Sequence, residues 1–591
     1  MSDDQLLTTV RRWIAHDPDP TTRDELQALS DAAESGDEAA LEELRGLFAG
    51  RLTFGTAGLR AALGPGPLRM NRLVVRQTAW GLVHFARGRM TTGEEDGTGS
   101  VAIGFDARHG SHDFAVETAR VFLEAGWQVG AFDRPMPTPV LAQQVMFEDA
   151  DIGIMVTASH NPPRDNGYKV YFGGRLARLV ESDGAGVGAQ ITAPTDVQVA
   201  GLIDAVVEDT MSAAPADPQP PAQQSLTMPP RVWKLGWTAR AAYRWNTASL
   251  VDRRRHPHRD LRIVYTAMHG VGAEMVAAAL RDAKFRDVVE VEEQCRPDPD
   301  FPTVEFPNPE EPGALDLALK TAERHDADLV LANDPDADRL SAAAFDPARG
   351  AWRQLSGDEM GVLLGAHILE RGALSPEAPE GAPVVMANSV VSSRQLGALC
   401  RARGVEHHQT LTGFKWLARV RGLTFGYEEA IGFCVDPHSV RDKDGVSAAV
   451  ILAELAAQLR ADGRTLFDRL AEIAEETGHF VTGQITVRVE ELSQLGEITS
   501  ALRNAPPAEL AGSPVTAALD LQKDPLPGRR FEEATVTDAL IFDTEAGDRV
   551  IVRPSGTEPK VKCYLEAVGD TRDEAEARLE VLRGSLESLV S

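Results

Sequence analysis

Four short segments of this 591-residue chain bring together side chains that could carry out chemistry. The first is TASHNP at residues 157–162, directly after the apolar run 152–156. A hydroxyl at the carboxyl end of a parallel strand lies where open α/β sheets bind their ligands, so Ser159 is a candidate nucleophile. It lacks the G-x-S-x-G context of a hydrolase elbow, which disfavours acyl transfer. The alternative is a serine that caps the next turn, with His160 on the surface.

An acidic loop follows a second apolar run, at residues 329–332. Its aspartates, Asp334, Asp336 and Asp338, alternate along the chain and converge on one point if the loop curls, which gives the oxygen ligands that Mg²⁺ or Ca²⁺ requires. An EF-hand would need Gly at the sixth position of the loop and Glu at the twelfth, where this chain has Arg and Phe. The pattern therefore predicts a cation site of another kind, with a solvated acidic turn as the alternative.

Two further segments contain groups suited to a phosphorylated sugar. The adjacent Glu428 and Glu429, bounded by glycines, could accept hydrogen bonds from sugar hydroxyls, although acidic residues also favour a helix start. The segment RPSGTEPK at 553–560 combines a guanidinium, hydroxyls and a glycine that lets backbone N–H groups approach, which suits a phosphate dianion. A β-turn with flanking charges is the alternative for this last segment.

The elements that must position these segments alternate between short apolar runs and longer amphipathic stretches. The strand-like runs are VAIGFDAR, DIGIMVTAS, LRIVYTAMHG, ADLVLANDPD and APVVMANSV, which begin at residues 101, 151, 261, 327 and 382. Alternating strands and helices predict parallel sheets in a doubly wound α/β architecture. After residue 480, further strand-like runs and a charged helix at 571–589 predict a smaller α+β domain. Residues 1–50 are predicted to form two helices.

A chain of this length is too long for one hydrophobic core and is predicted to fold as several domains. We predict three similar doubly wound α/β domains plus a smaller C-terminal α+β domain, arranged around a central cleft. The predicted boundaries are 1–205 for domain I, 206–345 for domain II, 346–478 for domain III and 479–591 for domain IV. The segment 214–230, rich in Pro and Gln, is the best candidate linker.

Composition limits the partners that the protein can have. The 60 Lys and Arg are outnumbered by 89 Asp and Glu, and the net charge of -29 would repel a polyanion over most of the surface. We therefore expect no nucleic-acid partner and no membrane partner. The four cysteines lie far apart and are typical of reduced thiols. The first residues are acidic and lack the apolar core of a signal peptide, so we expect a cytoplasmic protein.

In this order, the four segments resemble the motifs of the α-D-phosphohexomutase superfamily, which includes phosphoglucomutases and phosphomannomutases. Three more segments carry the resemblance: FGTAGLR at 54–60, NGYK at 166–169 and LTGFK at 411–415. The resemblance covers nearly the whole chain, from residue 53 to residue 562. It implies an intramolecular phosphotransferase, an isomerase that moves a phosphate within one sugar by way of a phosphoserine.

The resemblance also implies a role for each segment. Ser159 would be the phosphoserine, Arg60 would lie beside it, and Ser159, Asp334, Asp336 and Asp338 would bind one Mg²⁺ per chain. Lys169, or else His160, would move the proton if neighbouring cations lower its pKa, and Lys169 is the preferred base. The implied substrate-binding residues are Arg339, Thr412, Gly413, Lys415, Glu428, Ala430, Arg441, Lys443, Arg553, Ser555, Gly556, Thr557 and Lys562.

The implied reaction interconverts a sugar 1-phosphate and a sugar 6-phosphate, of glucose or mannose or both, through a bisphosphate that also serves as activator. One loop departs from the glucose and mannose branches, because the chain has Ala430 where their Glu-x-Ser places a hydroxyl. This loop looks more like that of the branch that contains phosphopentomutases and bisphosphate synthases, and like that of some bacterial enzymes named phosphomannomutases. The alternatives are therefore a phosphopentomutase acting on 1- and 5-phosphates, a sugar-1,6-bisphosphate synthase, and a non-catalytic sugar-phosphate sensor. The expected partner is a small phosphosugar, and the sequence predicts no oligomeric state.

Overall fold

The computed structural model describes most of the chain. The described residues are 1–53, 58–91, 97–213, 226–376, 381–488, 492–524, 526, 537–554 and 560–590. Parts of two predicted motifs lie outside them, namely residues 54–57 of the N-terminal signature and Ser555, Gly556 and Thr557 of the phosphate-binding segment. Most of the predicted linker at 214–230 also lies outside the described residues.

Residues 1–50 form three helices, so the prediction of two helices is wrong. They are α1 (Asp3–His16), α2 (Pro20–Glu34) and α3 (Glu38–Leu47). The break between α2 and α3 falls at Asp37, whose carboxylate accepts hydrogen bonds from the backbone N–H groups of Ala39 and Ala40 and so begins a new helix. Leu6, Val10 and Leu44 pack between the helices in a small apolar core.

The first sheet, sheet I, has parallel strands at its centre and antiparallel strands at one edge. Its order is β1-β5-β4-β2-β3-β7, with β6 paired to β5. The strands are β1 (Leu59–Ala62), β2 (Ser100–Phe105), β3 (Gln128–Phe132), β4 (Ile152–Val156), β5 (Asp165–Phe172), β6 (Ala189–Gln190) and β7 (Trp233–Leu235). The helices that follow these strands are α4 (Arg72–Met90), α5 (Ser111–Glu124), α6 (Thr138–Phe147), α7 (Gly174–Val180) and α8 (Thr195–Ser212).

Sheets II and III repeat this plan. Sheet II has the order β12-β11-β10-β8-β9 and sheet III the order β14-β13-β15-β16. The elements of sheet II are β8 (Arg262–Thr266), β9 (Asp287–Glu290), β10 (Leu329–Asn333), β11 (Leu340–Asp346), β12 (Ala351–Gln354), α9 (Trp237–Ser249), α10 (Gly272–Asp282) and α11 (Asp316–Arg324). Those of sheet III are β13 (Val385–Ser389), β14 (Glu406–Thr410), β15 (Leu423–Glu428), β16 (Gly432–Cys434), α12 (Gly357–Arg371), α13 (Gln395–Ala402), α14 (Phe414–Leu417), α15 (Gly445–Ala461) and α16 (Leu466–Thr477).

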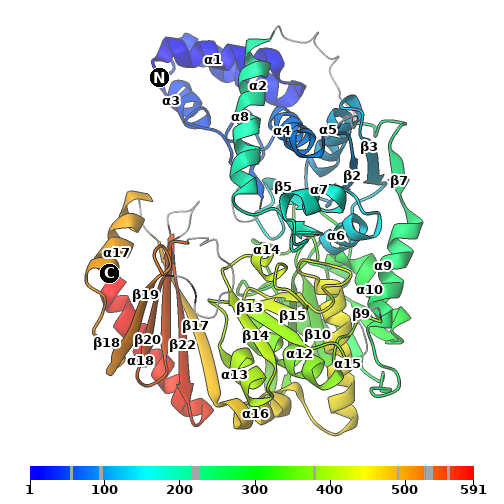
Figure 1. Cartoon of the computed structure of the whole chain (residues 1–591), viewed down its shortest axis with the longest axis vertical. Coiled ribbons are helices and arrows are strands. Elements are labelled where there is room, and N and C mark those ends of the chain that lie inside the picture. The colour runs from blue at the N-terminus through cyan, green and yellow to red at the C-terminus, as the bar shows by residue number, and fades with distance from the viewer. Residues whose placement is uncertain are drawn as a thin grey trace.

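Sheet IV is entirely antiparallel and is covered by helices on one face (Figure 1). Its order is β17-β22-β21-β20-β19-β18. Its elements are β17 (His479–Arg488), β18 (Glu509–Leu510), β19 (Ser513–Asp520), β20 (Leu540–Thr544), β21 (Arg549–Pro554), β22 (Lys560–Gly569), α17 (Leu492–Asn504) and α18 (Arg572–Val590). The predicted fold class, three doubly wound α/β units and a smaller C-terminal α+β unit, is confirmed.

The three α/β sheets share one local design, in which a parallel strand turns back into a neighbouring antiparallel strand. The pairs are β4 and β5, β10 and β11, and β15 and β16. Each connecting loop starts at the carboxyl end of a buried parallel strand, where α/β sheets place their ligands. The three loops contain Ser159, the three aspartates, and Glu429 with Ala430. The fold therefore places the same kind of loop toward the site three times.

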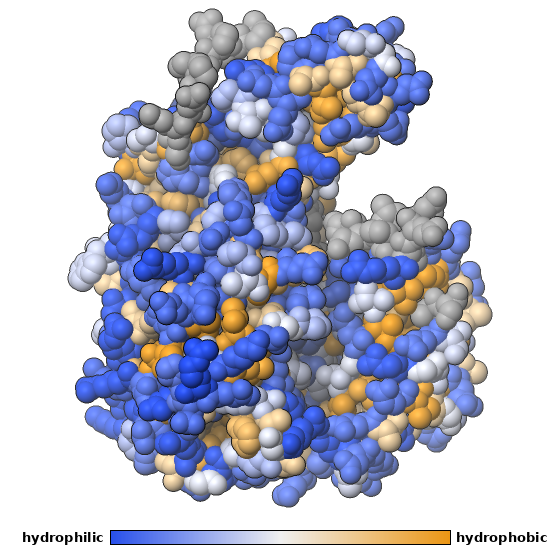
Figure 2. Space-filling model, turned by 180° about the vertical axis from the view of Figure 1, so that it is seen from behind, coloured by the Kyte–Doolittle hydropathy of each residue, from blue (hydrophilic) through white to orange (hydrophobic). Residues whose placement is uncertain are grey.

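The four sheets are arranged around an opening. Figure 1 shows sheets II and III side by side, with sheet I above them and sheet IV on the side of the molecule opposite to α9. Figure 2, the view from behind, shows a largely hydrophilic surface that is hollowed between the lobe of α1–α3 and sheet IV. Strand β7 lies in the range predicted for domain II, yet it pairs with β3 of sheet I. The predicted domain boundaries themselves stay a prediction.

Sheet IV is attached to the third α/β unit by buried polar contacts. Glu566 of β22 accepts hydrogen bonds from the hydroxyl of Ser393 at 2.7 Å and from the backbone and side chain of Arg394. The hydroxyl of Thr482 in β17 donates to Asp358 at the start of α12, at 2.9 Å. Within the described ranges, every helix is too short or too polar to cross a membrane.

Candidate active site

The loop that carries Ser159 meets the acidic loop of sheet II. The hydroxyl of Ser159 donates a hydrogen bond of 2.6 Å to Asp334, and both side chains are buried. Ser159 itself has φ of 51°, and the other two site loops contain Ala337 at 55° and Ile431 at 50°. Left-handed backbone at a non-glycine residue is strained and is concentrated at functional loops. Three such residues, one in each loop, indicate that the loops are held in place by their surroundings.

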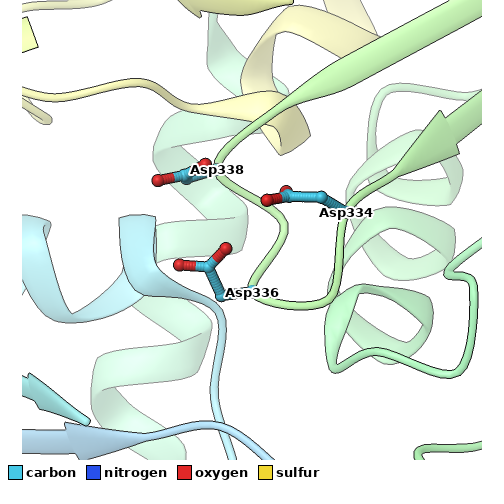
Figure 3. A group of neighbouring side chains, drawn as sticks. All are labelled: Asp334, Asp336 and Asp338. Carbon is cyan, nitrogen blue, oxygen red and sulfur yellow. The ribbon is translucent and has the colours of Figure 1, made fainter. Parts of the chain in front are cut away.

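Asp334, Asp336 and Asp338 form a compact acidic cluster, as the sequence predicts. Figure 3 shows the three carboxylates converging from one curled loop toward a common space. One oxygen from each lies within 4.8 Å of the others, and all three residues are buried. Gly445 allows this loop to approach the third α/β unit, because a Cβ there would lie 2.2 Å from the carbonyl oxygen of Arg339.

The donor set of this cluster fits a divalent cation. One oxygen of Asp336 and one of Asp338 are buried and have no hydrogen-bond partner among the residues that the structure describes. Buried carboxylate oxygens normally have a hydrogen-bond partner or a cation beside them. Two oxygens without a hydrogen-bond partner, in a cluster of three carboxylates, therefore indicate a cation site. All the ligands are hard oxygen donors, which suit Mg²⁺ or Ca²⁺ rather than a softer metal.

Lys169 closes the cluster from the side of sheet I. Its Nζ lies 2.7 Å from Asp336 and 2.7 Å from Asp338. Burial alone would lower the pKa of Lys169, but the two carboxylates outweigh burial and raise it. The condition for Lys169 to act as a base, a pKa lowered by neighbouring cations, is therefore not met. This geometry does not favour Lys169 as the base, because two carboxylates hold its Nζ, and its role in proton transfer stays a prediction.

The pKa values of the three aspartates shift in different directions, because the aspartates have different charged neighbours. Burial raises the pKa of Asp334 well above its usual value, and Asp336 and Asp338 add to the effect. Burial would also raise the pKa of Asp336, but contact with Lys169 lowers it overall. The pKa of Asp338 is lowered as well, because Lys169 and Lys443 outweigh its burial. Asp334, the partner of Ser159, is thus the carboxylate least compensated by protein cations.

His160 and Arg60 lie on the other side of the nucleophile. The Nδ1 atom of His160 is 3.3 Å from the hydroxyl of Ser159. Burial, then Arg339 and Arg60, lower the pKa of His160 well below its usual value, so the imidazole is neutral near pH 7. Arg60 donates to the side chain of Asn161 at 3.3 Å, and its buried Nε has no hydrogen-bond partner within the described part of the chain. A cationic group with an unused donor is therefore available beside Ser159.

The glutamates of the third loop separate into two environments. Glu428 accepts a hydrogen bond of 2.6 Å from the backbone N–H of Gly413, and its pKa is raised by burial and by Glu429. Glu429 accepts hydrogen bonds from the hydroxyls of Ser389 and Ser392 at 3.0 and 2.9 Å. Only Glu428 is thus free of side-chain hydroxyl partners, which leaves it as the acceptor for a ligand.

The predicted substrate cations have different positions. Lys443 lies 3.2 Å from Asp338, and Lys415 lies 3.7 Å from Asp196. Burial lowers the pKa of Lys415, and Asp196 only partly offsets this. Arg441 does not face the site, because its guanidinium donates to the backbone carbonyls of Gly184, Ala185 and Val187. In this structure Arg441 fastens a loop of the first α/β unit, and its predicted contact with substrate stays a prediction.

A pocket of about 220 Å³ joins residues from all four sheets. Thirteen of the predicted site residues line it, namely Arg60, Ser159, Lys169, Asp338, Arg339, Thr412, Gly413, Lys415, Glu428, Ala430, Lys443, Arg553 and Lys562. A second cavity, of about 350 Å³, shares Glu429 and Tyr564 with it. Arg339, buried in the centre, has its pKa raised because Asp334 and Asp338 outweigh burial. Seven Lys and Arg side chains therefore line the pocket, where a phosphorylated ligand would need them.

Several residues that support the site were not found from the sequence. Arg108 donates to the backbone carbonyls of Ser159, Asn161, Pro162 and Asp165, and so fixes the nucleophile loop. The only sequence signal is its position directly after a predicted strand, in VAIGFDAR.

Three more residues support the site through their side chains. The hydroxyl of Thr138, at the start of α6, donates to Asp336 at 2.5 Å. Asp442 accepts from Tyr171 and Gln190 and contacts Lys443 at 3.3 Å. Glu310 reaches Arg339 at 3.7 Å. The partners of Thr138 and Asp442 come together through the packing of one unit on another, and Glu310 reaches Arg339 from a distant part of the same unit, so no local pattern predicts these contacts.

Four models of one protein family match the chain in order. They are described as Phosphoglucomutase/phosphomannomutase, alpha/beta/alpha domain I at residues 51–181, domain II at 241–346, domain III at 356–477, and C-terminal domain at 485–583. Together they cover most of the chain and all four sheets. The matched segments contain Ser159, the acidic cluster, the glutamate pair and Arg553.

Individual relatives cover nearly the same span. A "Probable phosphomannomutase" of Haemophilus influenzae is 42% identical over 505 residues, which is 85% of this chain and 94% of the relative. A human "Phosphopentomutase" is 33% identical over 610 residues, with 95% of this chain and 92% of the relative covered. A crystal structure of a phosphoglucomutase/phosphomannomutase family protein from Burkholderia thailandensis superposes with a TM-score of 0.62 at 18% identity, over 90% of this chain and 97% of that one. This last similarity concerns the fold.

Proposed function

Because the chain belongs to the phosphoglucomutase/phosphomannomutase family, we propose that it is a phosphosugar mutase that interconverts sugar 1-phosphate and sugar 6-phosphate, of glucose or mannose or both. The observation that carries this proposal is the contact of 2.6 Å between the hydroxyl of Ser159 and Asp334, inside a pocket lined by cations from all four sheets. A protein that only sensed a sugar phosphate would not need a strained serine against three buried carboxylates.

The proposed resting enzyme carries a phosphate on Ser159, which adds about 1.5 to 2 negative charges at neutral pH. Arg60 and Arg339 are placed to pair with this phosphate, since each has a buried Nε without a hydrogen-bond partner among the described residues. Asp334, Asp336 and Asp338 would hold one Mg²⁺ ion, which neutralises charge on the phosphoryl oxygens when bound. A sugar bisphosphate would supply the phosphate of the resting enzyme and so act as activator.

In the transfer step, the bond between the phosphorus and the Ser159 oxygen breaks while a bond to a sugar hydroxyl oxygen forms. The sugar hydroxyl loses its proton and the Ser159 oxygen ends with one. His160 is placed to exchange this proton, because its neutral Nδ1 lies 3.3 Å from the serine oxygen. Lys169 keeps its proton and holds Asp336 and Asp338 in position. Phosphoryl transfer depends mainly on such positioning and charge.

The other end of the sugar would bind at the side of sheet IV. Arg553 and Lys562 line the pocket there, and burial lowers the pKa of Lys562. The resemblance adds Ser555, Gly556 and Thr557 as phosphate ligands. Glu428, Thr412 and Lys415 would contact the ring between the two ends. A bisphosphate that turns over within this enclosure would return its second phosphate to Ser159, which completes the isomerisation.

A phosphopentomutase acting on 1- and 5-phosphates is the second candidate. It is favoured by Ala430, which removes a hydroxyl from the sugar loop, and by the human relative of that name, which covers 95% of this chain. A human "Glucose 1,6-bisphosphate synthase" is 32% identical over 98% of the chain. That activity would need an acyl phosphate or similar donor and would release the bisphosphate as product.

The test is a panel assay with glucose 1-phosphate, mannose 1-phosphate and ribose 1-phosphate, each with Mg²⁺ and a trace of the matching bisphosphate. The proposal predicts turnover of a hexose phosphate that is lost in Ser159→Ala. Preference for ribose 1-phosphate would select the second candidate, and accumulation of bisphosphate from an added acyl phosphate would select the synthase. No turnover of any sugar would refute all three. We also propose a cytoplasmic location, on the basis of the sequence.

A further inference from the structure

A third cavity lies apart from the pocket of the active site. It has a volume of about 930 Å³ and is formed by α9, the turn after it, the end of α10 and the end of α12. It shares no lining residue with the pocket that contains Ser159. In Figure 1, α9 and α10 lie on the side of the molecule opposite to sheet IV. None of the residues assigned above to the mutase reaction lines this cavity.

One wall of the cavity is an exposed aromatic stripe on α9. Trp237 and Trp245 keep 73% and 69% of their surface exposed, and Ala241 lies between them at one helical turn from each. Residues spaced by four lie on one face of a helix, so both rings border the same hollow. Scattered exposed apolar residues are ordinary, but two exposed tryptophans on one cavity wall mark a surface that binds something flat and apolar.

The charge around this wall is opposite to that of the whole chain. Residues 231–262 contain nine Lys and Arg against two Asp and no Glu, whereas the chain has 60 Lys and Arg against 89 Asp and Glu. The cavity itself is lined by five cations and two carboxylates. One of these carboxylates, Asp282, is already paired with Arg244 at 2.8 Å. The local excess of positive charge therefore favours an anionic occupant.

Three cationic side chains of the cavity have N–H donors that form no hydrogen bond with the described residues. The side chains of Arg254 and Lys284 are exposed and make no hydrogen bond or ion pair with any residue in the described ranges. Arg371 is different, because its side chain is only 7% exposed. Glu454 and the carbonyl of Leu250 fix its terminal nitrogens, and its buried Nε has no partner among the described residues.

We propose that this cavity binds a nucleoside phosphate, with the base against the tryptophans of α9 and the phosphates on Arg254, Lys284 and Arg371. A nucleobase has an apolar face that can stack on tryptophan. Phosphate oxygens can accept hydrogen bonds from the donors of these cations. The volume is in the range of pockets that hold small molecules. An acidic polypeptide segment would also match the charge. The recessed Arg371, however, suits a small phosphate group better than the surface of a folded partner.

The test is isothermal titration of the full chain with ATP, ADP and AMP, with EDTA present so that no metal bridges the phosphates to the acidic cluster. Ribose 5-phosphate, which has no base, and adenosine, which has no phosphate, are the matched ligand controls. The matched variants are Trp245→Ala and Lys284→Glu, both at exposed positions. Arg553→Ala serves as the control for binding in the active site.

The expected result is one nucleotide per chain, weakened at least tenfold by Trp245→Ala and by Lys284→Glu and unchanged by Arg553→Ala. Measured on Arg553→Ala, in which phosphate binding at the active site is impaired, both control ligands should bind at least tenfold more weakly than the best nucleotide. The proposal is overturned if no nucleotide binds at millimolar concentration, or if Arg553→Ala abolishes binding while Trp245→Ala does not. It is also overturned if ribose 5-phosphate binds Arg553→Ala as well as AMP does, or if a glutamate-rich peptide binds through Trp245 and nucleotides do not.

Discussion

Asp358 should make the stability of the protein depend on pH in a way that one substitution removes. The residue is 9% exposed and accepts hydrogen bonds from the backbone of Ser393 at 2.7 Å and from Thr482 of sheet IV at 2.9 Å. Burial is the largest influence on it and, with the nearby Glu429 and Glu566, raises its pKa from 3.8 to about 7. The Asp358→Asn variant keeps the size and shape of the protonated carboxyl and cannot ionise.

The sign follows from the protons bound in each state. Below about pH 4, Asp358 is protonated in both folded and unfolded chains and contributes no pH dependence. Between that pH and about pH 7, Asp358 is ionised in the unfolded chain but protonated in the folded chain, so folding becomes less favourable as pH rises. The slope is about 1.4 kcal/mol per pH unit over about three units, which gives about 4 kcal/mol as the largest loss. Above pH 7 both states are ionised and the loss is constant.

Urea unfolding of the wild type and of Asp358→Asn at pH 5, 6, 7 and 8 measures this directly. The free energy of unfolding of the variant should exceed that of the wild type by an amount that grows from pH 5 to pH 7 and then levels off. Other titrating groups are common to both proteins and cancel in the difference. Asp24→Asn, at a side chain that is 80% exposed, is the matched control and should run parallel to the wild type. A constant difference across the pH range would refute the reasoning.

Three further predictions follow from the contacts of the site. Asp336→Asn should lower kcat by about a thousandfold or more and weaken the response to added Mg²⁺, because it removes a ligand of the cluster; activity within tenfold of the wild type would contradict the assignment. Arg441→Ala should change KM less than threefold, since its guanidinium binds backbone carbonyls, and a tenfold rise in KM would return it to the substrate site. Glu566→Gln should lower the free energy of unfolding by about 1–3 kcal/mol and speed proteolysis between sheets III and IV, because it breaks the contact with Arg394; unchanged proteolysis would show that Glu566 does not anchor sheet IV.

Much of the site could be predicted because its chemistry is local in sequence. Asp334, Asp336 and Asp338 lie within five residues, and the loop between two strands is enough to bring them together. Ser159 follows a buried strand, which already places it at the ligand edge of a sheet. The fold class followed from the same alternation of strands and helices.

What could not be predicted depends on contacts between distant units. The proposed role of Lys169 as a base requires a pKa lowered by nearby cationic side chains. The sequence does not show that two carboxylates of sheet II contact its Nζ. Arg441 stands in a motif that suggests substrate binding, yet packing directs it to the backbone of the first α/β unit. The sequence does not show what Arg108 and Thr138 contact, because their partners lie more than 50 residues away.

The proposed mutase mechanism requires that Ser159 carries the phosphate that is transferred. The direct measurement is a single-turnover reaction, in which enzyme phosphorylated by labelled glucose 1,6-bisphosphate and freed of ligand is mixed with unlabelled glucose 1-phosphate. Peptide mapping should locate the label on Ser159 before mixing, and about one equivalent should then appear in the sugar bisphosphate. Label on another residue, label that stays on the protein, or mutase turnover retained by Ser159→Ala would contradict the account.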